Sequence, residues 1–239
     1  MPLSSSFNQK PTHGAVAAPP FALLLQEVRS LTRVRRAGHA GHIFQTSHNG
    51  QNHPVLVVPG FLASDQATAT LRRTLKAANY NSYGWGMGRN LGVRADMFER
   101  LDRRMDHIQS HRGEPVTIIG WSLGGLIARE YAKYAPGRVA KVITLGSPFS
   151  GDLRANHAWR LYEIIARHRI DCPPIRVELN QKPPVPTFAI WSRMDGVVAD
   201  HCARGLPDES DEAIEVQCGH LGFTSAPDAL RAVFRALQA

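Results

Sequence analysis

The sequence predicts an α/β fold in which a mostly parallel sheet of about six strands is flanked by helices. Short apolar segments of strand length alternate with longer segments whose apolar residues recur at helical spacing. This alternation is typical of parallel sheets that are covered on both faces. The 239 residues are enough for one large α/β domain with a sizeable core. A composition of 43% hydrophobic and 20% charged residues is ordinary for a globular protein.

The N-terminal part is expected to differ from the rest. Residues 1–20 are rich in Ser, Pro and Asn and are predicted to be a disordered tail. A single domain, residues 21–239, is expected to follow. Its first element is an amphipathic helix, Phe21–Arg36, and a Gly- and His-rich stretch leads on to His53. The apolar face of that helix is formed by Phe21, Leu24, Leu25, Val28, Leu31 and Thr32.

From residue 54 onward, strands and helices alternate. Ser64 or Asp65 could cap the first helix of this region. The predicted strands are Pro54–Pro59, Tyr80–Gly88 (a strand and then a loop), Pro115–Ile119, Val139–Leu145, Pro186–Trp191 and Ala213–Gln217. The predicted helices run to about Asn79, over Arg94–His111, through Leu126–Ala132 and over Pro227–Leu237. The irregular segment of residues 150–184 holds one further helix, Ala155–His168, and is expected to form a small cap over the site.

The segment Gly120-Trp121-Ser122-Leu123-Gly124 lies between a predicted strand and a predicted helix. Gly-x-Ser-x-Gly in this context is the pattern of a nucleophile elbow, a sharp turn that lifts a serine hydroxyl out of a sheet. The glycines allow close approach of backbone on either side of the strained serine. A glycine-rich connector is the alternative interpretation of the same letters.

Reactive groups of a parallel sheet gather at the carboxyl ends of its strands. Ser122, Asp195 and His220 each follow a different predicted strand, in the order Ser, Asp, His. The imidazole can remove the serine proton, and the aspartate can fix its tautomer. The backbone amides of Leu123 and Phe61 are the expected oxyanion donors. No metal site is predicted.

Other residues compete for these roles. Asp195 precedes Gly196 and could be a turn residue, and His201 is a rival base. Asp171 and Asp200 are rival acids that follow no predicted strand, and Ser147 ends a strand without the elbow context.

These motifs resemble those of the α/β-hydrolase superfamily, specifically small bacterial lipase- and esterase-like members, over about residues 54 to 237. The resemblance implies an α/β-hydrolase fold and an acyl-enzyme on Ser122, with no cofactor. Two positions depart from common lipase patterns: Pro59-Gly60 replaces His-Gly, which leaves the second oxyanion donor open between Phe61 and Leu62, and Trp121 replaces His. The matching segments are Val57–Phe61, Gly120–Gly125, Leu145–Pro148, Trp191–Gly196 and Gly219–Gly222.

The expected substrate is a small-molecule or lipid-like carboxylic ester. Its acyl group would lie among the apolar residues Leu62, Phe149, Val197 and Val198, and Trp121 is either a substrate contact or packing beside the elbow. Acyl transfer, thioester cleavage and amide cleavage use the same triad and remain alternatives. A non-catalytic binding module is a further hypothesis.

The net charge of +8 and the pI near 9.9 allow attraction to an anionic membrane surface. Arg29, Arg33, Arg35 and Arg36 form the one dense basic cluster, interpreted as a solvated helix face or as a lipid contact. No nucleic-acid motif appears. A cytoplasmic location is expected because no secretory signal or membrane span is visible. Cys202 and Cys218 could form one disulfide or be free buried thiols.

Overall fold

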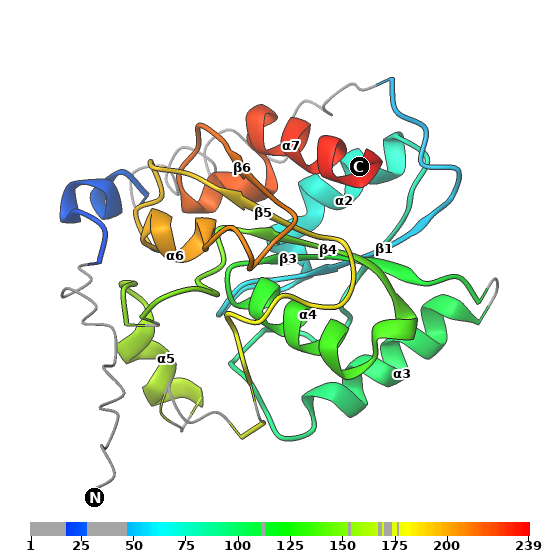
Figure 1. The fold of residues 1–239 in the computed structure, drawn as a ribbon, viewed down its shortest axis with the longest axis horizontal. Coiled ribbons are helices and arrows are strands. Elements are labelled where there is room, and N and C mark those ends of the chain that lie inside the picture. Colours follow the sequence, from blue (N-terminus) through cyan, green and yellow to red (C-terminus); the bar gives the residue numbers. More distant parts are fainter. Residues whose placement is uncertain are drawn as a thin grey trace, which may run out of the picture.

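Six parallel strands form one sheet with helices on both faces (Figure 1). The computed structural model describes residues 18–27, 47–110, 113–152, 154–166, 169, 174–175 and 177–239. The predicted fold class is confirmed. Most of the expected N-terminal tail and the cluster of Arg29, Arg33, Arg35 and Arg36 lie outside the described residues.

The strands are arranged in the order β2-β1-β3-β4-β5-β6. Every predicted strand is present, with ends that differ by a few residues. β1, β3 and β5 are buried along their whole length, which explains their continuously apolar sequences. The strands are β1 Pro54–Val58, β2 Asn81–Gly84, β3 Val116–Trp121, β4 Val139–Leu145, β5 Thr187–Trp191 and β6 Glu212–Glu215.

Helices connect successive strands. The helix expected to begin at Ser64 or Asp65 starts as the 3-10 turn η1, and neither side chain caps it. The Asp65 carboxylate instead accepts the amides of Trp85 and Gly86 at 2.9 and 3.0 Å. The short helix α6 was not predicted. The elements are η1 Asp65–Thr68, α2 Ala69–Ala77, α3 Met97–Gln109, α4 Leu123–Tyr134, η2 Pro136–Arg138, α5 Trp159–Ala166, α6 Asp200–Arg204, η3 His220–Thr224 and α7 Pro227–Gln238.

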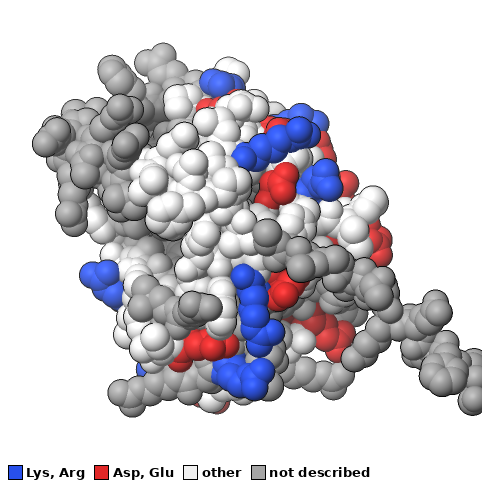
Figure 2. All heavy atoms as spheres, turned by 90° about the vertical axis from the view of Figure 1, so that its left-hand side faces the viewer, with Lys and Arg blue, Asp and Glu red and all other residues white. Residues whose placement is uncertain are grey.

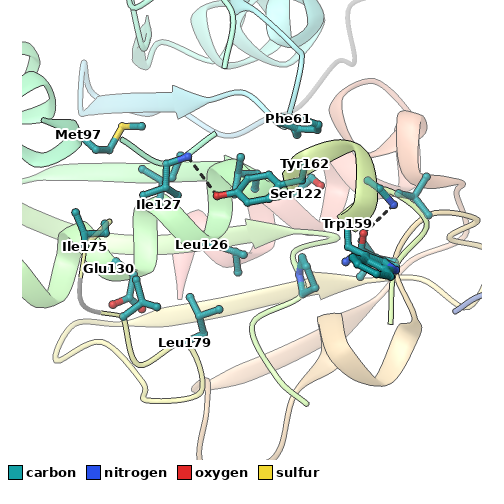
Figure 3. A pocket seen from close by; sticks show the side chains of 18 of the residues that line it. Phe61, Met97, Ser122, Leu126, Ile127, Glu130, Trp159, Tyr162, Ile175 and Leu179 are labelled. Atoms are coloured by element: carbon teal, nitrogen blue, oxygen red, sulfur yellow. Dashed lines mark hydrogen bonds between the residues drawn. The ribbon is translucent and has the colours of Figure 1, made fainter. Parts of the chain in front are cut away.

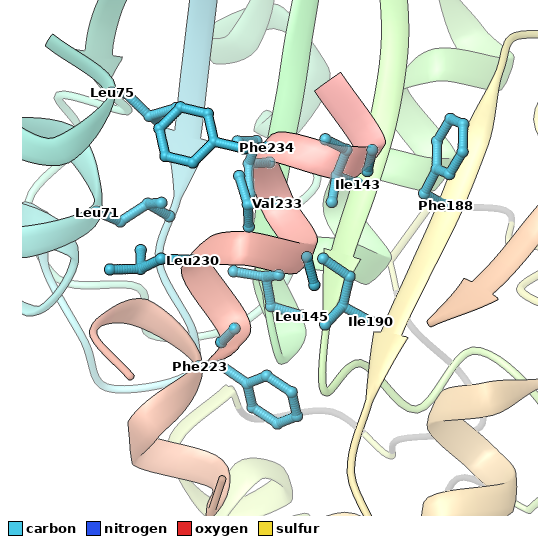
Figure 4. Close-up of a cluster of buried hydrophobic side chains, with 14 of the residues drawn as sticks. Leu71, Leu75, Ile143, Leu145, Phe188, Ile190, Phe223, Leu230, Val233 and Phe234 are labelled. Carbon is cyan, nitrogen blue, oxygen red and sulfur yellow. The ribbon is translucent and has the colours of Figure 1, made fainter. Parts of the chain in front are cut away.

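Two hydrophobic cores lie on the two faces of the sheet. On one face, α2 and α7 pack against alternate strand residues, and Figure 4 shows Leu71, Leu75 and Phe234 over Ile143 and Leu145. On the other face, α3 and α4 cover the strand residues that point the opposite way. Packing on both faces of the sheet holds the strands rigidly and so fixes the loops at their carboxyl ends. No helix within the described ranges is long and apolar enough to cross a bilayer.

The N-terminal helix, Phe21–Glu27 in the described part, does not bury the face that its sequence indicates. Phe21 and Leu25 are 65% and 46% exposed, whereas Glu27 is only 6% exposed. Of the predicted face, Phe21 and Leu25 are therefore exposed in these two turns, and Leu24 is partly buried. Burial of the carboxylate is possible because its oxygens accept the backbone amides of Gly196, His220 and Leu221.

Candidate active site

Ser122 occupies the sharp turn between β3 and α4. Its backbone has φ 54° and ψ −121°, a conformation that costs a non-glycine residue about 1–3 kcal/mol. Such strain is found where surrounding packing over-determines it, and active sites are common examples. The side chain is half-buried and lines a cavity. This geometry is that of the elbow which the sequence pattern predicts.

The glycines around Ser122 are required by contacts with backbone. A Cβ on Gly120 would overlap the carbonyl of Gly124. A Cβ on Gly124 would overlap the Val58 carbonyl oxygen and lie 2.8 Å from that of Pro59. The start of α4 is thus pressed against the end of β1, which brings the loop after β1 beside the serine.

His220 and Asp195 form a buried pair at the ends of the neighbouring strands. His220 Nδ1 lies 2.8 Å from Asp195 Oδ2, and both side chains are almost fully buried. The other carboxylate oxygen, Oδ1, accepts the amides of Val197 and Val198 at 2.8 Å each. These amides hold the carboxylate in place, and the carboxylate in turn fixes Nδ1–H and leaves the Nε2 lone pair available.

The environment of the imidazole favours its protonation overall. Burial alone lowers the pKa of His220, but the charge of Asp195, its hydrogen bond and the charge of Glu27 together raise that pKa above its ordinary value. An imidazolium formed by proton transfer would therefore be stabilised at this position.

The ring of His220 lies next to the elbow. Its centroid is 5.7 Å from that of Trp121, and Trp121 Nε1 donates to the His220 carbonyl at 3.1 Å. No hydrogen bond joins the Ser122 hydroxyl to His220 in the described part of the chain. Bonds between a base and its nucleophile are often long without substrate and tighten in the complex.

The loop after β1 supplies an unused amide beside the serine. A Cβ on Gly60 would lie 3.2 Å from that of Ser122, so this loop directly adjoins the nucleophile position. The amide of Leu62 donates to the Asn90 carbonyl at 2.7 Å and is unavailable. The Phe61 amide donates to no acceptor among the described residues. Leu123 is the first residue of α4, where amides have no partner within the helix.

A largely apolar cavity, partly open to solvent, begins at Ser122 (Figure 3). One face of α4 lines it, through Leu123, Leu126, Ile127 and Glu130. This face extends about 10 Å along the helix axis. Trp159 and Tyr162 of α5 line the other side, and the Tyr162 ring lies 5.3 Å from that of Phe61.

The arrangement of sheet, elbow and strand-end loops agrees with a known family. The family model described as the alpha/beta hydrolase fold matches residues 54–169. The chain has the α/β-hydrolase fold. No curated protein matches it.

Solved structures of lipases and esterases share the fold. One belongs to the metagenome-derived lipolytic enzymes LipS and LipT, with a TM-score of 0.59 and 16% identity over 80% of this chain and 95% of the other. Aspergillus fumigatus lipase B gives a TM-score of 0.61 and 20% identity over 82% of this chain and 55% of the lipase. The naproxen esterase of Bacillus subtilis gives a TM-score of 0.52 and 16% identity over 79% of this chain and 85% of the esterase. At these identities, the likeness concerns the fold.

Some of the expected substrate contacts of this α/β-hydrolase line the cavity and others do not. Val197 and Val198 line it, together with Phe61. Leu62, Trp121 and Phe149 are not among the described residues around the cavity. Phe149 is buried beneath the Arg129 guanidinium, and Trp121 packs on His220, which agrees with the packing interpretation of Trp121.

The rival residues are placed differently from the favoured ones. His201 Nδ1 lies 3.5 Å from Oδ1 of its neighbour Asp200, its ring is half-exposed, and it is not among the residues that line the cavity. The Ser147 hydroxyl is fully buried and lies 3.5 Å from the Leu145 carbonyl oxygen. Asp171 lies outside the described residues.

Cys202 and Cys218 are free and buried, so the structure holds no disulfide between them. Burial raises the pKa of the Cys202 thiol to about 11 and that of Cys218 to about 12. Both are therefore unreactive thiols at neutral pH.

Asn90 is a residue of the site that sequence reasoning missed. It is fully buried, and its Nδ2 donates to the Pro59 carbonyl at 2.8 Å. Its backbone exchanges further hydrogen bonds with Leu62 and Ala63. Asn90 thus holds the loop that carries the Phe61 amide. An isolated asparagine in a loop gives no sequence signal for such a role.

Proposed function

We propose that this α/β-hydrolase cleaves carboxylic esters through an acyl-enzyme on Ser122. The observation that carries the proposal is the strained elbow of Ser122, which opens on an apolar cavity and adjoins the buried Asp195–His220 pair. The hydrolase fold and its lipase and esterase neighbours support the same class of activity.

In the proposed first step, His220 Nε2 removes the Ser122 proton while Oγ attacks the ester carbonyl carbon. Asp195 stays ionised, keeps the imidazole oriented through Nδ1 and stabilises the imidazolium. The imidazolium then returns the proton to the leaving alkoxide, and the alcohol departs from the acyl-enzyme. In the second half, His220 takes a proton from water as the water oxygen attacks the acyl carbon. The bond from that carbon to Ser122 Oγ then breaks, the imidazolium returns the proton to Oγ, and the acid is released.

The negative oxygen of each tetrahedral intermediate would be held by the amides of Leu123 and Phe61. The engagement of the Leu62 amide by Asn90 favours Phe61 over Leu62 as the second donor. Each such donor typically contributes about 3 kcal/mol to the transition state.

The cavity supports an apolar acyl group as the substrate part that binds beside α4. Its wall is aliphatic and aromatic from Ser122 as far as Glu130, where the Glu130–Lys133 ion pair marks a polar end. The face of the molecule at the carboxyl ends of the strands supports an uncharged substrate as well. Among the described residues on this face, Lys and Arg side chains lie next to Asp and Glu side chains, and they border a broad area without charged residues (Figure 2).

A fluorophosphonate probe tests this proposal because it phosphorylates only an activated serine. We expect labelling of the wild-type protein and its complete loss in Ser122→Ala. Ser147→Ala is the matched control and should label normally if it folds, because Ser147 is buried away from the cavity. Labelling that survives in Ser122→Ala would contradict the assignment. A series of p-nitrophenyl esters, the corresponding thioesters and amides, and acceptor alcohols then separates ester hydrolysis from the alternative acyl chemistries.

Asn90→Ala is expected to lower kcat roughly 10- to 100-fold with little change in KM. The substitution frees the Pro59 carbonyl and loosens the loop that carries the Phe61 amide, and this amide acts mainly in the transition state. Initial rates on p-nitrophenyl butyrate measure the effect. Asn81→Ala, an exposed position at the start of β2, is the matched control and should have wild-type rates. A normal kcat in Asn90→Ala would refute the positioning role.

A further inference from the structure

The carboxylate of Glu27 joins three backbone amides from two loops. Its Oε1 accepts the amide of His220 and that of Gly196, the latter at 3.3 Å. Its Oε2 accepts the amide of Leu221 at 3.2 Å. Gly196 directly follows Asp195, so one carboxylate links the loop of the acid to the loop of the base. The same two loops also meet at the Asp195–His220 hydrogen bond and where the Cys218 amide donates to Ser192 Oγ at 3.4 Å.

The two loops are shaped to receive the N-terminal helix. A Cβ on Gly196 would lie 2.5 Å from the carbonyl of Leu23, and one on Gly219 would overlap Glu27 Oε1. The segment just before the helix is attached as well, because His157 Nε2 lies 2.8 Å from the Pro19 carbonyl oxygen. Close packing against glycines and a buried carboxylate with three amide partners together make a specific contact.

We propose that Glu27 is a positioning residue which clamps the Asp195 loop to the His220 loop and so keeps the imidazole aligned with Ser122. The inference rests on the proposed function for its kinetic consequence. The N-terminal helix is then a functional part of the hydrolase domain, although it precedes the first strand by some thirty residues. The role is carried by the hydrogen bonds and by the charge of the same side chain.

The charge of Glu27 acts on His220 together with that of Asp195. Among the described residues, these are the charged groups that act on the imidazole, and the remaining ring neighbours are Trp121 and Phe223. Burial lowers the pKa of His220, whereas both carboxylates raise it. Removing the charge of Glu27 therefore lowers this pKa, and the base becomes available at a lower pH.

Glu27→Gln separates this role from mere attachment of the helix. Glutamine keeps the size and one acceptor oxygen, but it loses the charge and presents an NH2 group to one of the amides. We expect kcat/KM to fall roughly 10- to 100-fold through misalignment of the base. We also expect the acidic limb of the pH profile to move to lower pH. Glu27→Asp keeps the charge with a shorter reach, so its profile should stay near the wild-type position while kcat remains reduced.

The experiment combines kinetics with a measurement that needs no activity. Kinetics on p-nitrophenyl butyrate against pH are recorded for the wild-type protein, Glu27→Gln, Glu27→Asp and the exposed control Glu99→Gln. The titration of the His220 ring is followed by NMR, its signal being identified among the eleven histidines as the one missing in His220→Ala. Thermal unfolding shows that each variant is folded.

The expected result is a lower titration midpoint for His220 in Glu27→Gln and an unchanged midpoint in Glu99→Gln. An unchanged midpoint and profile in folded Glu27→Gln would overturn the inference, even if stability fell. A wild-type protein without esterase activity would refute the proposed function, and the NMR titration would still decide whether Glu27 acts on His220.

Discussion

Replacing His220 with alanine is expected to lower kcat on ester substrates by roughly four to six orders of magnitude. The imidazole is the one group in the proposed mechanism that both removes the serine proton and returns it to the leaving group. Without it, Ser122 stays a weakly nucleophilic alcohol. Purified His220→Ala and Ser122→Ala are compared with the wild-type protein by steady-state kinetics on p-nitrophenyl butyrate.

The matched control for this prediction is His201→Ala. His201 lies half-exposed beside Asp200, so its loss should leave kcat within about twofold of the wild-type value. The double variant Ser122→Ala, His220→Ala should be no slower than either single variant, because residues that act as a unit are not additive. A near-normal rate in a pure His220→Ala sample would contradict the base assignment, and a collapse in His201→Ala would move that role to the rival histidine.

The central strands were predictable because they are largely buried on both faces. Buried parallel strands are mostly apolar, so the sequences of β1, β3 and β4, rich in Val and Ile, identify them directly. The elbow was predictable for a similar reason, since few residues other than glycine fit beside the strained Ser122. Short elements gave weaker signals. α6 has only five residues, which is too few to display a helical period.

The contacts that support the site could not be predicted because they bind backbone rather than complementary side chains. Glu27 and Asn90 form hydrogen bonds with amides and carbonyls of distant loops. Every residue has the same backbone groups, so the residue types do not reveal these partners. The apolar pattern of the N-terminal helix was misleading for the same reason. Phe21 and Leu25 suggested the buried face, but both are exposed, and the buried Glu27 instead accepts three backbone amides. The cavity likewise depends on how α5 folds over α4.

Arg129→Ala is expected to destabilise the protein by roughly 3–5 kcal/mol, a large part of the stability of an ordinary domain. Arg129 is fully buried in α4, and its guanidinium donates to the carbonyls of Leu179, Gln181 and Glu209 at 3.3, 3.2 and 2.9 Å. Its carbon Cζ also lies 4.1 Å from the ring centre of Phe149. The substitution leaves three carbonyls without a donor and creates a cavity over that ring.

Urea unfolding followed by circular dichroism measures this loss, and Arg231→Ala supplies the matched control. Arg231 is exposed and pairs with Asp228, so its removal should cost less than about 0.5 kcal/mol. Burial lowers the pKa of Arg129 to about 10, so the side chain stays charged at neutral pH and its hydrogen bonds are charge-assisted. Arg129→Lys keeps the charge but lacks the planar guanidinium. Its loss of unfolding free energy should lie between those of Arg129→Ala and Arg231→Ala. Equal urea midpoints for Arg129→Ala and Arg231→Ala would contradict this prediction. They would show that the segment containing Leu179 and Gln181 is held to α4 by apolar contacts alone.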